Sequence, residues 1–193
     1  MEKTYITADD LLLDSIKLAE QIYTRGCRPH FIIGVWRGGT PTGIAVQEFL
    51  DYMGVKTDHI AIRTSSYYGI DQQAKEIHVH GLDYVIDNVE ADQELLIVDD
   101  VFDSGRSINA IIEKLKQRCR RNMPETVKVA CPWYKPTRNV TGITPDYYMH
   151  ATDKWLVFPH ELQGLTLEEI KQGKGPEFAE IIARANEAQQ AQG

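Results

Sequence analysis

The stretch that decides the fold is Glu94-Leu95-Leu96-Ile97-Val98-Asp99-Asp100-Val101-Phe102-Asp103-Ser104-Gly105-Arg106-Ser107. It begins with an apolar run that is short, partly β-branched and not alternating, which is typical of a buried strand in a parallel sheet. After Ser107, apolar residues recur with the period of an amphipathic helix, at Ile108, Ile111, Ile112, Leu115 and Cys119. The stretch therefore predicts a strand, a loop over residues 103–107 and a helix.

This loop has the composition of a phosphate-binding site. Gly105 permits a tight turn, Ser104 and Ser107 supply hydroxyl donors, and the free N–H groups at the start of a helix favour an anion. Asp99 and Asp100 follow the strand directly, at the edge where open α/β sheets bind ligands. Adjacent carboxylates at that edge can hold ribose hydroxyls or a hydrated Mg²⁺ ion.

The segment Val98–Ser107 resembles the phosphoribosyl-pyrophosphate (PRPP) signature of type I phosphoribosyltransferases. The resemblance implies that the acids hold the ribose, and that the loop grips the 5-phosphate through Asp103, Ser104, Gly105, Arg106 and Ser107. The alternative is a strand, a turn rich in capping residues and a helix that bind nothing. A Walker phosphate loop and a dinucleotide G-x-G-x-x-G fingerprint are both missing from the sequence.

A second strand, loop and helix lie earlier in the chain. Phe31–Val35 predicts a core strand, and Thr40-Pro41 predicts a capping residue and first turn of a helix that ends near Met53. The glycine pair in Trp36-Arg37-Gly38-Gly39 would let backbone N–H groups approach an anion. A similar loop binds pyrophosphate in the 6-oxopurine phosphoribosyltransferases. The resemblance therefore implies a pyrophosphate-binding role and a cis Trp36–Arg37 peptide for these residues, with Arg37, Gly38 and Gly39 as the contacts.

Further elements are predicted on either side of the central stretch. Thr7 opens a helix with an inward stripe at Leu12, Ile16, Ala19, Ile22 and Tyr23. Short apolar runs predict strands at His59–Ile62, Tyr84–Ile86 and Val127–Cys131. Residues 63–69 are expected to form a loop: either an exposed hairpin connection or, by resemblance, the mobile catalytic loop that closes over PRPP, with Ser66 and Tyr67 as contacts.

The resemblance also implies a hood that holds the base. Lys135 resembles the lysine that donates to the purine 6-oxo group, with an ordinary surface lysine as the alternative. Trp155-Leu156-Val157-Phe158-Pro159-His160-Glu161 resembles the segment whose first Trp stacks on the purine. By this resemblance Trp155 and Leu156 bind the base, and Glu161 reaches a second Mg²⁺ ion beside the one held by Asp99 and Asp100. His160 departs from the pattern, which usually has Trp.

Composition narrows the class of protein. Lys+Arg 21 against Asp+Glu 28 leaves a formal net charge of -7, which argues against broad nucleic-acid binding. The three cysteines form no C-x-x-C pair, so neither a disulfide framework nor a zinc site is expected. No apolar stretch is long enough to cross a bilayer and no signal-peptide pattern opens the chain. We expect a cytoplasmic protein that forms a homodimer or homotetramer.

The sequence thus predicts an α/β fold of the type I phosphoribosyltransferase kind, a mostly parallel sheet flanked by helices with a small hood. We expect one domain over residues 1–193, with the hood from about 1–12 and 133–165 and a helical tail from about 166–193. The implied activity is purine salvage: Mg²⁺-dependent transfer of the 5-phosphoribosyl group from PRPP to hypoxanthine, guanine or xanthine, with Asp103 accepting the base proton. The alternatives are a nucleotide-binding regulator of the same fold and an adenine or pyrimidine enzyme.

Overall fold

The computed structural model describes residues 3–68 and 75–190. By its internal contacts the chain divides into two compact units, a larger one at Leu12–Asp153 and a smaller one that combines Met1–Leu11 with Lys154–Gly193. The boundaries predicted for the hood and the helical tail remain a prediction.

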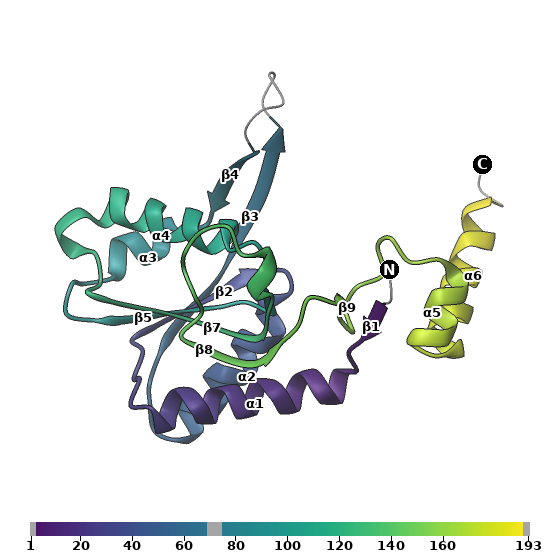
Figure 1. Ribbon diagram of the computed structural model, residues 1–193, viewed down its shortest axis with the longest axis horizontal. Helices are drawn as coiled ribbons and strands as arrows, with labels where there is room; N and C mark the ends of the chain where they lie inside the picture. Colours follow the sequence, from purple (N-terminus) through teal and green to yellow (C-terminus); the bar gives the residue numbers. More distant parts are fainter. Residues whose placement is uncertain (1–2, 69–74, 191–193) are drawn as a thin grey trace. The chain divides into compact units, whose positions relative to one another are not determined.

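The larger unit is built on a sheet whose order is β4-β3-β2-β5-β7-β6, with β8 on the other side of β7 (Figure 1). All of its described pairings are parallel except that of β3 with β4. The predicted, mostly parallel sheet is therefore confirmed. The strands are β2 (Phe31–Trp36), β3 (Asp58–Tyr68), β4 (Lys75–His80), β5 (Glu94–Val98), β6 (Val101–Phe102), β7 (Thr126–Tyr134) and β8 (Tyr147–Ala151).

Helices cover both faces of this sheet, as Figure 1 shows. Ile33 and Ile97 point to the face of α3 and α4, where the core includes Ile111 and Leu115. Ile32, Leu96 and Val98 point to the opposite face, where α1 and α2 complete a second core. Because both faces are covered, the central strands are apolar throughout instead of alternating. The helices are α1 (Ala8–Thr24), α2 (Gly39–Tyr52), α3 (Asp83–Asn88) and α4 (Arg106–Cys119), with 3₁₀ turns η1 (Arg120–Asn122) and η2 (Pro136–Arg138).

The structure confirms the strands predicted at residues 31–35, 95–98 and 127–131 and the helix after the central stretch. The expected stripe of that helix is largely buried, at Ile108, Ile111, Leu115 and Cys119. Thr7 is confirmed as a helix cap, because its Oγ1 accepts a hydrogen bond from Asp10 N at 3.1 Å.

Four local predictions were wrong. Tyr84–Ile86 lies in α3, because Leu82, Val85 and Val89 share one buried helical face. Residues 63–68 continue β3 and pair with β4, where a loop had been expected. The third error concerns a helix end, because Thr40 lies inside α2, whose N-cap is Gly38. The fourth concerns the buried face of α1, where Leu12 is 57% exposed and Leu11 and Leu18 are buried instead.

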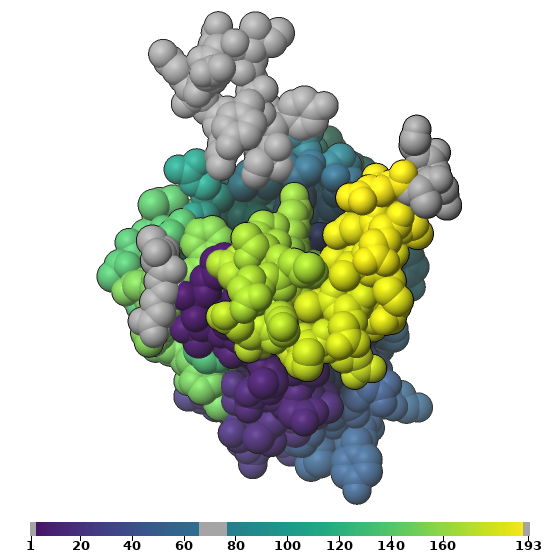
Figure 2. All heavy atoms as spheres, turned by 90° about the vertical axis from the view of Figure 1, so that its right-hand side faces the viewer, coloured from purple at the N-terminus to yellow at the C-terminus, as the bar shows by residue number. Residues whose placement is uncertain are grey.

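The smaller unit pairs β1 (Lys3–Tyr5) in parallel with β9 (Trp155–Val157) and adds two helices, α5 (Leu167–Gly173) and α6 (Pro176–Gln190). Figure 2 shows the two helices lying side by side. Thr166 and Glu169 form a capping box at the start of α5, and Lys3 reaches Glu169 at 2.6 Å. These contacts tie the N-terminal strand to the C-terminal helices.

The start of α2 packs against the end of β5 without room for a side chain. A Cβ atom on Gly39 would lie 2.5 Å from Val98 O and 2.7 Å from Asp99 Cα, which is closer than carbon can approach backbone. Gly43, one turn further along the same helix, would place its Cβ atom in ordinary contact, 3.5 Å from Gly34 Cα. Gly39 is thus required by packing, whereas Gly43 is not.

We expect Gly39→Ala to lower the free energy of unfolding by about 1–3 kcal/mol, because either α2 or β5 must shift to admit the methyl group. Gly43→Ala is the matched control, and it should be neutral or stabilising by up to about 1 kcal/mol, since alanine favours the helix. Urea unfolding of both variants measures the difference. Equal stability of the two variants would show that the close approach at Gly39 is not a constraint.

Candidate active site

The site is assembled at one edge of the sheet by parallel pairing. Gly34 of β2 pairs with Val98 of β5, so the segments that follow the two strands emerge at the same edge. A Cβ atom on Gly38 would overlap the carboxylate of Asp100. The structure thus brings together two of the predicted groups, the glycine loop at residues 37–39 and the acid pair, and the Trp36–Arg37 peptide is cis, as the resemblance implied.

The side chains of Asp99 and Asp100 each accept a hydrogen bond from the backbone N–H of the next residue. Asp99 Oδ1 accepts a hydrogen bond from Asp100 N at 3.0 Å, and Asp100 Oδ1 accepts one from Val101 N at 2.8 Å. Asp100 is only 8% exposed. Burial, and then the neighbouring charge of Asp100, raise the pKa of the Asp99 carboxyl well above its usual value. A bound cation or sugar hydroxyls would relieve this crowding of two like charges.

The predicted phosphate loop joins β6 to α4. Gly105 is the N-cap of α4 and has φ 75°, a left-handed conformation that favours glycine. Beside it lies a pocket of about 80 Å³, whose lining includes Asp99, Asp103, Ser104, Gly105 and Ser107. The pocket opens at the start of a helix of fourteen residues, where backbone N–H groups and the helix dipole favour a phosphate.

The phosphate loop is held from outside by residues 139–143. Val140 N donates to Ser104 O at 3.2 Å, and a Cβ atom on Gly105 would lie 2.5 Å from Thr141 Oγ1. Asn139 organises this covering turn, because its side chain accepts from Thr141 N at 3.0 Å and donates to Ile143 O at 2.7 Å. Sequence reasoning assigned no role to this turn.

Asp103 is bound by two cations. Lys135 Nζ lies 3.2 Å from Asp103 Oδ2, and Arg138 Nε donates a hydrogen bond to Asp103 Oδ1 at 2.6 Å. Lys135 is 8% exposed, so it is a buried cation and not a surface lysine. The backbone fixes this arrangement, because Lys135 N donates to Phe102 O at 2.9 Å. Sequence reasoning did not identify Arg138 as a site residue, because nothing in its local sequence indicates a contact with Asp103.

The remaining predicted site residues belong to β3 and to the smaller unit. The backbone of β3 carries Ser66 and Tyr67, which pair with Ile77 and Glu76 of β4; the rest of the predicted catalytic loop, residues 69–74, lies outside the described residues. Trp155 and Leu156 are on β9 of the smaller unit, where Trp155 is 51% exposed. Glu161, in the same unit, accepts a hydrogen bond from Phe158 N at 3.0 Å. The roles of these residues remain predictions.

The residues the structure describes contain no group of three or more His, Cys, Asp or Glu side chains that could hold a metal ion by themselves. Asp99 and Asp100 offer two carboxylates at the sheet edge. Mg²⁺ is often held by one or two carboxylates together with substrate oxygens and water, so this donor pair fits it.

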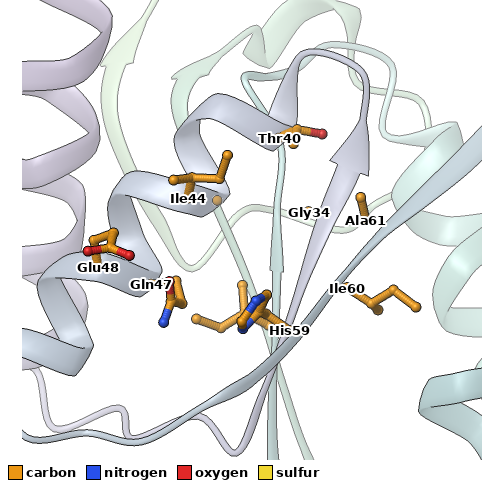
Figure 3. A pocket seen from close by; sticks show the side chains of 10 residues that line it. Gly34, Thr40, Ile44, Gln47, Glu48, His59, Ile60 and Ala61 are labelled. Atoms are coloured by element: carbon orange, nitrogen blue, oxygen red, sulfur yellow. The ribbon is translucent and has the colours of Figure 1, made fainter.

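A larger pocket of about 300 Å³ lies between α2 and the strands β2 and β3 (Figure 3). Ile44, Gln47 and Glu48 of α2 face His59 and Ala61 of β3 across it. None of the residues predicted to bind PRPP or the base lines this pocket. It is therefore distinct from the phosphate loop.

Among the residues described, no helix combines the length and the apolar character that a membrane span requires.

The chain is similar in sequence and in fold to known proteins. The hypoxanthine-guanine phosphoribosyltransferase of Streptococcus pyogenes is 28% identical over 149 residues, which cover 76% of this chain and 77% of that protein. The purine phosphoribosyltransferase of Pyrococcus horikoshii is 28% identical, with a TM-score of 0.66 over 86% of this chain and 98% of that one. A hypothetical protein of Neisseria gonorrhoeae with bound ppGpp shares the fold, with a TM-score of 0.71, 22% identity and coverage of 89% of this chain and 95% of that one.

The family model of the phosphoribosyl transferase domain matches residues 4–163, which include every group of the site described above. This match spans the strands, the acid pair, the phosphate loop and Lys135. The chain therefore belongs to the phosphoribosyl transferase domain family.

Proposed function

We propose that this enzyme transfers the 5-phosphoribosyl group of PRPP to a 6-oxopurine and releases pyrophosphate. The observation that carries the proposal is the placement of Lys135, a buried cation, against Asp103 at the mouth of the phosphate loop. There it can donate to the 6-oxo oxygen of a purine. The hypoxanthine-guanine phosphoribosyltransferase of Streptococcus pyogenes supports the same substrate class.

The sugar phosphate would bind along the sheet edge. The backbone N–H groups around Gly105 and the hydroxyls of Ser104 and Ser107, with Arg106 beside them, would hold the 5-phosphate. Asp99 and Asp100 would bind the ribose hydroxyls. The glycine loop with Arg37 would hold the pyrophosphate, because its closeness to Asp100 brings the leaving group and the ribose to one place.

Mg²⁺ belongs to the proposal as the ion that Asp99 and Asp100 would hold together with substrate oxygens, and it would neutralise the leaving pyrophosphate. Glu161 is proposed to reach a second ion. Trp155 and Leu156 would bind the base, and Ser66 and Tyr67 would contact PRPP. We also retain the expectation of a homodimer or homotetramer in the cytoplasm, where the three free cysteines would stay reduced.

Asp103 would accept the proton that the base nitrogen loses as it bonds to C1 of the ribose. Its position suits this role, because it is the first residue of the phosphate loop, close after the acid pair in the chain, and because it contacts Lys135, the proposed donor to the purine. The transition state is expected to have oxocarbenium character, so the base must be deprotonated while it is held against C1.

Pyrophosphate release from PRPP, measured with hypoxanthine, guanine, xanthine and adenine in turn, tests the proposal. We expect turnover with one or more of the three 6-oxopurines, hypoxanthine being our first choice, and little with adenine. Adenine as the best substrate would overturn the assignment of Lys135. Binding of nucleotides without any pyrophosphate release would favour a regulator of the same fold.

Lys135→Ala should narrow the preference for 6-oxopurines over adenine by tenfold or more, because an unpaired buried donor costs roughly 1–3 kcal/mol. The ratio of kcat/KM for hypoxanthine to kcat/KM for adenine measures the effect. Lys114→Ala, which removes an exposed lysine of α4, is the control and should leave the ratio unchanged. An unaltered ratio in Lys135→Ala would exclude the lysine from base selection.

Asp103→Asn should retain PRPP binding and slow transfer by on the order of 10² to 10⁴, since the amide keeps the size of the side chain and loses the proton acceptor. Single-turnover kinetics and PRPP titration separate the two effects. Asp87→Asn, at an exposed position of α3, is the matched control. A variant that turns over at the wild-type rate would remove Asp103 from the role of base.

Trp155→Ala should raise KM for hypoxanthine, guanine and xanthine by similar factors, because stacking on a purine face is common to all three; a loss of roughly 0.5–1.5 kcal/mol corresponds to a several-fold change. Steady-state kinetics with each base provide the measurement. A change confined to one base would indicate that Trp155 reads a substituent instead of the ring.

A further inference from the structure

Arg138 lies next to Asp103, the proposed proton acceptor, and the proposed function gives Arg138 no role. It ends the 3₁₀ turn η2, and its Nε donates to Asp103 Oδ1 at 2.6 Å, the shorter of the two cation contacts on that carboxylate. Its side chain is 54% exposed and that of Asp103 is 35% exposed. Both side chains are therefore partly open to solvent.

The two oxygens of Asp103 are held by different partners. Arg138 takes Oδ1, and Lys135 takes Oδ2 at 3.2 Å. A carboxylate engaged on both oxygens is poorly placed to accept a proton. A 6-oxopurine would give Lys135 a new acceptor in its 6-oxo group and would withdraw it from Oδ2.

We propose that Arg138 is a positioning residue, which fixes Asp103 through Oδ1 while the 6-oxo group of the base draws Lys135 from Oδ2 and so frees that oxygen as the proton acceptor. This inference rests on the proposed function. The base N–H proton passes to Oδ2, the electron pair of that bond forms the new bond from nitrogen to C1, and the C1–O electrons leave with pyrophosphate.

The backbone supports this division of roles. Lys135 N donates to Phe102 O at 2.9 Å, Arg138 N donates to Lys135 O at 3.2 Å, and Val140 N donates to Ser104 O at 3.2 Å. The turn that carries both cations is thus anchored to the residues on each side of Asp103. From this backbone Arg138 Nε reaches Asp103 Oδ1 at 2.6 Å. The lysine, on a flexible four-carbon stem, can move to a new acceptor.

In this scheme, recognition of the purine by Lys135 is coupled to the freeing of Asp103 as the proton acceptor. Adenine presents a 6-amino group, which is a donor and cannot draw Lys135 away, so Oδ2 would stay occupied and the proton acceptor would stay blocked. Discrimination would then appear in kcat as well as in KM. This distinguishes the scheme from one in which Lys135 contributes binding alone.

A double-mutant cycle tests the role of Arg138. Arg138→Gln, Asp103→Asn and the double variant are compared in full-length protein with saturating PRPP, Mg²⁺ and the 6-oxopurine that wild type uses best. We expect Arg138→Gln to lower kcat by on the order of tenfold or more with little change in KM for PRPP, and to cause less than about a twofold further loss in the Asp103→Asn background. Arg138→Lys should recover part of kcat, because it restores a cation near Oδ1.

Arg121→Gln, an exposed arginine of η1, is the matched control and should leave kcat unchanged. Multiplicative losses in the double variant would overturn the proposal, because Arg138 would then act independently of Asp103. A rise in KM for PRPP without a fall in kcat would also overturn it and would assign Arg138 to substrate binding. Absence of pyrophosphate release by wild type would contradict the proposed function itself, which separates the two failures.

Discussion

The parallel pairing of β2 with β5 is the constraint on which the site depends. It ends both strands at one edge, so that the glycine loop after β2 and the acid pair after β5 must occupy adjacent space. The absence of side chains at Gly38 and Gly39 is what allows this approach, because a Cβ atom at either position would overlap the chain around Asp99 and Asp100. Close packing therefore requires glycine at these positions.

A second constraint organises the other half of the site. The turn after β7 folds back over the phosphate loop, and its hydrogen bonds to Phe102 and Ser104 bring Lys135 and Arg138 to Asp103. The protein as a whole carries a net charge of -7, and at this edge two cations, Lys135 and Arg138, lie beside Asp103. Such cations can pair with the phosphate groups of a ligand.

Much of this arrangement could be predicted from the sequence. The apolar runs of β2, β5 and β7 and the helical period of α4 identified the elements, because a sheet covered on both faces leaves continuous apolar strands. The acid pair, the phosphate loop and the glycine loop could be identified because each follows one of these strands in the sequence. α3 was mistaken for a strand because Tyr84–Ile86 was considered alone, although Leu82, Val85 and Val89 already carried a helical spacing.

Other features depend on contacts between distant residues and had no local pattern to reveal them. The continuation of β3 to Tyr68 depends on pairing with β4. Arg138 reaches Asp103 across 35 positions of sequence, so only the folded backbone reveals the pair. Thr40 is a residue type that often caps helices, but α2 begins at Gly39. Gly38 and Gly39 pack at this helix start, where a larger residue has no room.

We propose that the edge formed after β2 and β5 is a single site for a ribose phosphate and its base. A crystal structure of the enzyme with inosine 5′-monophosphate would test this proposal. We expect the phosphate against the backbone N–H groups around Gly105, the ribose at Asp99 and Asp100, and Lys135 Nζ on the 6-oxo oxygen and no longer on Asp103. A nucleotide bound elsewhere, such as in the pocket between α2 and β3, or a Lys135 that remains on Asp103, would contradict it.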